Sequence, residues 1–200
     1  MVSKGLTAMA HLIDSLDSFI IIEVCIWKNY GGITMSILYK RRSIRKFQDK
    51  AVDKDIVEKL LRGAMSAPSA GNQQPWHFIV LDNKEIMNEI PKFHQYSQML
   101  KEAPIAIVVC GITENIKYPE YCVQDCSAAT ENLLIAITEL GLGGVWLGIY
   151  PREDRVKELS RLLNIPDGVF PLSVVAIGYA DEEKALIDRY MEDRVHYNKW

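Results

Sequence analysis

The chain has 200 residues, of which 48% are hydrophobic and 24% charged, and its formal net charge at pH 7 is −3. This composition is typical of one globular domain with a full hydrophobic core, and the acidic balance argues against nucleic acid as a general partner. The four cysteines show neither a Cys-x-x-Cys pair nor a Cys/His metal-ligand spacing. We therefore expect no bound metal, no disulfide framework and a cytoplasmic location.

The first 34 residues differ from the rest of the chain. Residues 18–27 form an apolar run, but Glu23 interrupts it and it is shorter than the roughly 20 residues of a membrane-spanning helix. No small-residue cleavage site follows, so a signal peptide is not indicated either. We expect no membrane association, an N-terminal extension over residues 1–34 and a single domain over residues 35–200.

A basic segment follows at residues 39–47, with the sequence YKRRSIRKF. It holds five cations and a serine, although the whole chain is mildly acidic. An arginine side chain offers a planar fork of donors that suits a phosphate group. The segment is therefore either a phosphate-binding site or a solvated basic turn, and these residues alone do not decide between the two.

Hydrophobic periodicity predicts alternating helices and strands in the rest of the chain. In the first half we expect a helix from Asp53 that Pro68 ends, a strand at 76–81, a short helix at 83–90 that Pro91 stops, and a strand at 105–110. In the second half we expect a long helix at 123–140 capped by Gly141, a strand at 145–149, a helix at 153–163, a strand at 172–179, and a polar tail from 188. The long helix is apolar on more than one side, so we place it at the centre or at an interface.

Such alternation also occurs in Rossmann-like parallel sheets. The glycine cluster at 141–144, however, follows a helix and precedes a strand, the reverse of a dinucleotide-binding fingerprint. A Rossmann dinucleotide site is therefore disfavoured.

Two further segments carry chemistry. Residues 66–78 (SAPSAGNQQPWHF) form a loop of small and amide residues between a helix and a strand, which suits either contact with a planar ring or an ordinary turn. His77 lies inside the strand run, and we interpret it as a histidine of the core, or one that supports a site from behind, rather than a catalytic one. Residues 141–151 (GLGGVWLGIYP) supply glycine-flanked backbone that suits either the face of a flat ring or a tight turn before a buried strand.

Together with the tail sequence DRVHYNKW at 193–200, these segments resemble the FMN-dependent nitroreductase family, and the resemblance covers residues 35–200. It implies an α+β fold, with a central mixed, mostly antiparallel sheet flanked by helices and a long central helix at a dimer interface. It also implies a homodimer with FMN bound at the interface between the two chains, and NADH or NADPH as electron donor.

The resemblance also suggests roles for individual residues. Arg41, Arg42 and Ser43 would hold the FMN phosphate and ribityl chain, while Arg45 would reach the pyrimidine edge of the ring and tune it. The remaining expected cofactor contacts are Pro68, Ser69, Ala70 and Asn72 at the ring edge or from the partner chain, Leu147 and Gly148 behind the ring, and Arg194 at the phosphate. Some family members carry an acidic residue where this chain has Leu147, and the segment 93–100 is shorter than in larger members.

The function implied is an FMN-dependent NAD(P)H oxidoreductase that reduces small electron-poor acceptors, such as nitroaromatics or quinones, by ping-pong hydride transfer. The flavin performs the chemistry, so no catalytic side chain is required. Two alternatives remain open: a flavin-binding or storage protein without turnover, and a specialised reaction such as dehalogenation or flavin breakdown.

Overall fold

The computed structural model describes residues 36–200, so the predicted extension at 1–34 and the domain start at Met35 lie outside the described residues. By their contacts the residues fall into two compact units, 1–40 and 41–200. The described part of the first unit includes the short helix α3 (Ile37–Lys40). The remaining elements belong to the second unit, which carries every predicted cofactor contact.

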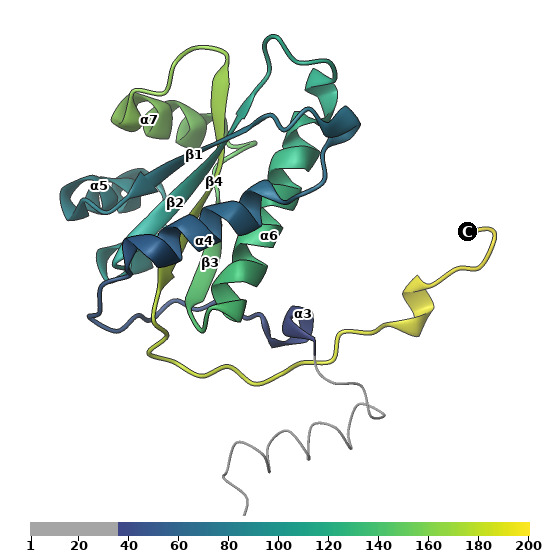
Figure 1. The fold of residues 1–200 in the computed structure, drawn as a ribbon, viewed down its shortest axis with the longest axis horizontal. Coiled ribbons are helices and arrows are strands. Elements are labelled where there is room, and N and C mark those ends of the chain that lie inside the picture. Colours follow the sequence, from purple (N-terminus) through teal and green to yellow (C-terminus); the bar gives the residue numbers. More distant parts are fainter. Residues whose placement is uncertain (1–35) are drawn as a thin grey trace, which may run out of the picture. The chain divides into compact units, whose positions relative to one another are not determined.

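A four-stranded sheet forms the centre of the second unit (Figure 1). Its strands are β1 (Trp76–Leu81), β2 (Ile105–Ile112), β3 (Gly143–Gly148) and β4 (Val169–Gly178). They lie in the order β1-β2-β4-β3, and each ladder is antiparallel. Among the described residues, the one parallel pairing is an isolated bridge between Ser43 and Gly144. The predicted α+β class with a mostly antiparallel sheet is confirmed.

Helices cover both faces of this sheet because successive strand residues point to opposite sides. Ile107 and Val109 of β2 pack in one core with α4 (Lys54–Met65) and the long helix α6 (Cys122–Glu139). Ala106 and Val108 pack in a second core with α5 (Lys84–Phe93) and α7 (Glu153–Leu163). The expected central position of α6 is confirmed, since the buried residues along one broad face of this helix pack in the core with α4 and the sheet.

Three sequence-based expectations need correction. Pro91 does not stop α5, which continues to Phe93, because a proline near the helix end costs only one backbone bond. The last strand begins at Val169 rather than 172, and its Pro171 faces a register shift in β2, where a missing N–H is tolerated. His77 is exposed on the edge strand β1 and is not a core residue.

Three of the four cysteines are small thiols in the hydrophobic core. Cys110, Cys122 and Cys126 are buried and free, and Cys25 lies outside the described residues. Burial raises the pKa of Cys110 to about 12. Between residues 36 and 200, no group of three or more His, Cys, Asp or Glu side chains could hold a metal ion. In that same range no helix has the length and apolar character needed to cross a membrane.

Residues 41–47 of the basic segment lie along the free edge of β3. The backbone N–H of Ile44 donates to Gly144 O at 3.0 Å. After β4 the chain returns beside the same segment: Gln48 N donates to Tyr179 O at 2.9 Å and Asp181 N to Lys46 O at 3.0 Å. The basic segment is thus held between β3 and the stretch that follows β4, two parts of the chain far from it in sequence.

Gly143 permits this close approach, because a Cβ there would lie 2.7 Å from Ile44 Cγ2 and 2.8 Å from Ile44 Cβ. Gly143→Ala should therefore push the basic segment away from β3 and lower the free energy of unfolding by about 1–3 kcal/mol. Urea unfolding followed by circular dichroism measures the loss. Gly148→Ala is the matched control on the same strand, since nothing lies within 4 Å of its added Cβ. Equal stability of the two variants would contradict this account.

Candidate functional site

The basic segment lines a cavity of about 350 Å³, together with the stretch that follows β4. Its wall includes Arg41, Arg42 and Ser43, which the family resemblance assigns to the phosphate, and also Arg45, which it assigns to the pyrimidine edge of the ring. Lys184 and Arg189, which follow β4 in the chain, also line it and bring the number of cationic side chains around the cavity to five. No carboxylate of the described residues is among its lining groups. Such a concentration of guanidinium and ammonium groups suits a multiply charged anion.

Hydrogen bonds orient the arginines of this cavity. Arg42 donates through Nε to Ala185 O at 2.8 Å and through Nη1 to Arg41 O at 2.7 Å, so it joins the basic segment to the stretch after β4. Arg41 Nε lies 3.3 Å from Glu131 Oε1 of helix α6. Lys184 and Arg189 were not among the contacts predicted from the sequence. Their only signal was a second group of cations after the last predicted strand.

Glu182 anchors the same two segments. Its carboxylate accepts a hydrogen bond from the backbone N–H of Arg45, and its Oε2 lies 3.0 Å from Lys184 Nζ. The bond from Arg45 is the main reason that the pKa of Glu182 lies below its ordinary value. The ionised form of this carboxylate is therefore favoured by folding.

This lowered pKa sets the direction of a pH effect. The stabilisation by Glu182 is complete above the ordinary glutamate pKa of about 4.3 and is lost as the pH falls through the lower pKa of the folded state. Glu182→Gln keeps an acceptor for Arg45 N but removes the titration, so its stability should fall less steeply below about pH 4.3 than that of the wild type. Melting temperatures recorded across this pH range test the effect, with Glu183→Gln as the exposed neighbouring control. Parallel acid profiles for Glu182→Gln and the wild type would contradict it.

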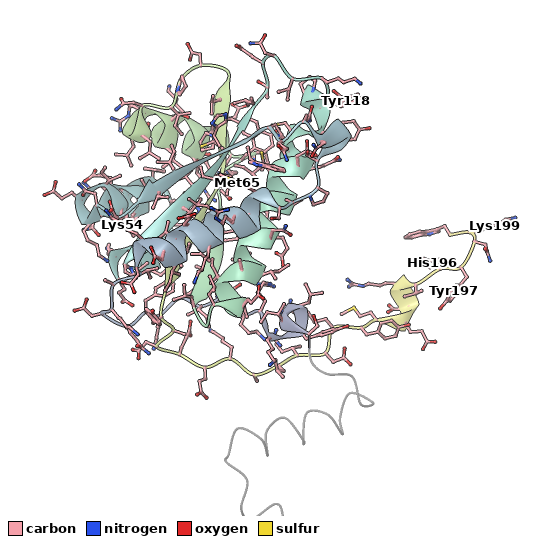
Figure 2. All side chains as sticks on the ribbon, in the orientation of Figure 1. Lys54, Met65, Tyr118, His196, Tyr197 and Lys199 are labelled. Carbon is pink, nitrogen blue, oxygen red and sulfur yellow. The ribbon has the colours of Figure 1, made fainter. Side chains whose placement is uncertain are left out.

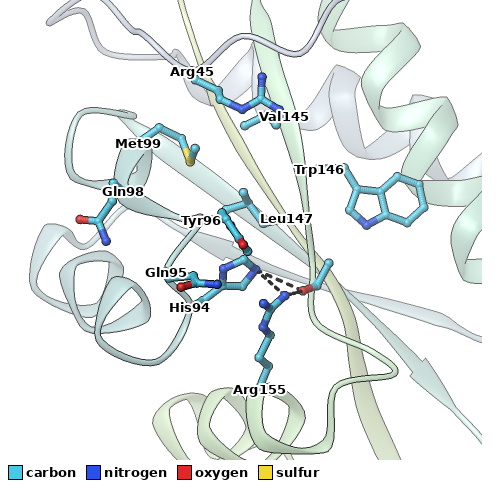
Figure 3. Close-up of a pocket in the computed structure, with 11 residues that line it drawn as sticks. Arg45, His94, Gln95, Tyr96, Gln98, Met99, Val145, Trp146, Leu147 and Arg155 are labelled. Carbon is cyan, nitrogen blue, oxygen red and sulfur yellow. Dashed lines mark hydrogen bonds between the residues drawn. The ribbon is translucent and has the colours of Figure 1, made fainter.

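A second cavity, of about 490 Å³, shares Arg45 with the first. Its floor is the backbone of β3 from Val145 to Gly148 with the side chains of Val145 and Leu147, whereas the Trp146 side chain points away from it, so the predicted contacts Leu147 and Gly148 both lie here (Figure 3). A Cβ on Gly148 would meet nothing within 4 Å, which leaves that backbone open to close approach by a flat ligand. Another wall is formed by five residues that follow α5: His94, Gln95, Tyr96, Gln98 and Met99. The predicted anion site and the predicted ring site are thus neighbours with one arginine in common.

His94 and Arg155 bind the end of β3 at this cavity. Arg155 Nη1 donates to Gly148 O at 2.8 Å, and His94 Nε2 lies 3.1 Å from the same oxygen (Figure 3). Burial lowers the pKa of His94 below its ordinary value, and the charge of Arg155 lowers it further, so His94 is neutral near pH 7. The sequence analysis assigned no role to either residue, because 54 positions separate His94 from Gly148.

The predicted contacts Pro68, Ser69, Ala70 and Asn72 line neither cavity. They lie after α4, where η1 (Ala70–Asn72) turns towards β1. The buried Asp125 of α6 holds this loop: it accepts from Ala70 N at 3.0 Å and from Gln73 Nε2 at 2.8 Å. Gln73 in turn accepts from the backbone N–H of Tyr118, which is labelled in Figure 2. The loop therefore has a defined conformation of its own, away from the two cavities of this chain.

Arg194 also lies outside both cavities. It belongs to η4 (Glu192–Arg194) in the C-terminal tail, where residues 191–200 are all exposed. The side chains of His196, Tyr197 and Lys199 project from this tail in Figure 2. Within one chain, six of the eleven predicted contacts are brought together at the two cavities, and the loop residues and Arg194 are not.

Comparison with known proteins relates this chain to one family. The model of the nitroreductase family matches residues 38–95 and 92–179. A protein of Archaeoglobus fulgidus, provisionally named an NADH dehydrogenase/NAD(P)H nitroreductase, is 48% identical over 170 residues, which cover 83% of this chain and 98% of the relative.

Two solved structures are similar as well. A provisionally named NADH oxidase from Clostridium acetobutylicum is 45% identical with a TM-score of 0.80, covering 82% of this chain and all of the other. An FMN-dependent nitroreductase from Clostridium difficile is 32% identical with a TM-score of 0.76, covering 82% of this chain and 98% of the other.

Proposed function

Because this chain belongs to the nitroreductase family, an oxidoreductase family, we propose that it is an FMN-dependent NAD(P)H oxidoreductase that reduces small electron-poor acceptors in a ping-pong sequence. The observation that carries the proposal is the pair of adjoining cavities with Arg45 in common. One has the cations for a phosphate, and the other has an apolar floor with open backbone for a flat ring. The chemistry of both cavities fits FMN. The similarity to the Clostridium difficile nitroreductase supports the same cofactor.

The phosphate would bind in the smaller cavity. Arg41, Arg42 and Ser43 provide charge and a hydroxyl, as the sequence predicted, and we add Lys184 and Arg189 from the wall formed by the stretch after β4. The bond from Arg42 to Ala185 O keeps the two walls together. Because this bond already orients the Arg42 side chain, less conformational entropy is lost when the anion binds.

The ring would lie against β3 in the larger cavity. When bound, FMN supplies the hydride-transfer chemistry, and the protein contributes binding, orientation and electrostatics. The backbone at Leu147 and Gly148 offers a close apolar contact, and Arg45 provides a positive charge that favours electron density on the ring. His94 and Arg155 keep the Gly148 carbonyl in place.

A homodimer would explain the predicted contacts that lie outside both cavities. We propose that Pro68, Ser69, Ala70 and Asn72, and Arg194 in the tail, contact the cofactor bound by the partner subunit. In support, Asp125 holds the loop in a defined conformation, and the tail is exposed throughout residues 191–200.

Anaerobic titration of the purified protein tests the proposed function. We expect a yellow protein that takes up FMN, bleaches on addition of NADH or NADPH, and regains its colour with a quinone or a nitroaromatic. Parallel double-reciprocal plots for donor and acceptor would support the ping-pong sequence. Retention of the yellow colour with both nucleotides would indicate a flavin-binding protein without turnover, and failure to take up FMN would refute both functions.

A further inference from the structure

The guanidinium group of Arg155 lines the larger cavity. The proposed binding of FMN assigns no partner to this group. Arg155 projects from the first turn of α7 to the wall that it forms with His94 and Gln95 (Figure 3). Its Nη1 is committed to Gly148 O at 2.8 Å and lies 3.2 Å from His94 Nε2. Two contacts from different elements thus determine where this side chain points.

The charge of Arg155 is not neutralised by the described part of the chain. Four other arginines, at positions 41, 62, 152 and 161, each have a carboxylate within 4.0 Å, but within residues 36–200 no carboxylate lies that close to Arg155. The nearby Asp154 pairs with Arg152 instead. His94 is neutral near pH 7, and its Nδ1 is buried without a hydrogen-bond partner among the described residues. A half-buried guanidinium therefore retains its full charge beside a cavity that no Asp or Glu lines.

We propose that Arg155 binds an anionic group, a carboxylate above all, on the molecule that accepts electrons at this site. The inference rests on the proposed function and narrows its substrate class to acidic aromatic acceptors. A guanidinium held by Gly148 O and His94 is already oriented, and its planar fork matches the two oxygens of a carboxylate. With the flavin ring on the floor that β3 forms, the aromatic part of the same molecule would stack on the exposed face of that ring.

Two probes of nearly equal size and shape, 4-nitrobenzoate and 4-nitrobenzamide, isolate the charge. Their dissociation constants are measured by calorimetry on the FMN-loaded protein without NAD(P)H, and their kcat/KM values by steady-state assay. Arg155→Gln should weaken 4-nitrobenzoate binding about tenfold or more, as for the loss of one charge-assisted hydrogen bond, and affect the amide far less. Arg155→Lys keeps the charge but not the planar fork. Its affinity for 4-nitrobenzoate should lie between those of the wild type and Arg155→Gln. Arg152→Gln, three residues earlier and outside this cavity, should behave as the wild type.

The possible outcomes separate this inference from the proposed function. Equal weakening of both probes by Arg155→Gln would mean that the residue only holds the end of β3, and it would overturn the inference. A change confined to the ratio of NADPH to NADH efficiency would assign the anion to the nicotinamide nucleotide and would overturn it as well. Failure of the wild type to reduce 4-nitrobenzamide would count against the proposed function, whereas the calorimetric preference for 4-nitrobenzoate would still support an anion site at Arg155.

Discussion

Arg42→Ala is expected to weaken FMN binding about tenfold or more while leaving the fold intact. The variant would lose the proposed charge-assisted contact to the phosphate. It also loses the bond to Ala185 O, which joins the two walls of the smaller cavity, and the local bond to Arg41 O. Fluorescence titration of the apoprotein with FMN measures the affinity, and circular dichroism verifies the fold.

Two further variants test the origin of this effect. Arg42→Lys keeps the charge without the planar fork and should recover part of the affinity. Arg161→Ala removes an arginine that pairs with Glu158 on the exposed side of α7, so its affinity should equal that of the wild type. An unchanged affinity in Arg42→Ala would show that the basic segment does not bind the phosphate.

Asp125→Ala is expected to lower the free energy of unfolding by about 3 kcal/mol. The buried carboxylate accepts charge-assisted hydrogen bonds from Ala70 N and Gln73 Nε2, and it is only 6% exposed. Without it the loop after α4 loses its link to α6. Urea unfolding gives the stability, and limited proteolysis shows whether cleavage begins within residues 66–75.

The variant Asp125→Asn tests whether the two hydrogen bonds of the carboxylate account for this loss of stability. Both partners of the carboxylate are donors, and an asparagine has one acceptor oxygen, so it can satisfy only one of them and should cause roughly half of the loss. Glu139→Ala, at the exposed end of the same helix, should change stability by no more than about 0.5 kcal/mol. If Asp125→Ala were as stable as Glu139→Ala, the carboxylate would not hold the loop.

Local patterns were sufficient to predict most of the fold. The apolar runs at 76–81 and 105–110 became β1 and β2, and the periodic segments became α4, α6 and α7. The errors occurred where tertiary contacts outweigh a local rule. Pro171 was not assigned to a strand, yet β4 includes it where the register of β2 shifts. His77 lies in an apolar run, but β1 is an edge strand and leaves its side chain exposed.

The sequence by itself determined the kinds of chemical groups at the site: the basic segment at 39–47, the amide-rich loop at 66–78 and the glycine-flanked strand at 141–151. These are properties of consecutive residues, so the local sequence is sufficient to predict them. Only the tertiary structure decided which groups meet. Pairing with β3 and with the stretch after β4 brings Lys184 and Arg189 to the basic segment, and the packing of α5 and α7 on one face of the sheet brings His94 and Arg155 to Gly148. Such contacts depend on sheet order and helix packing between residues far apart in the chain, and no local pattern records them.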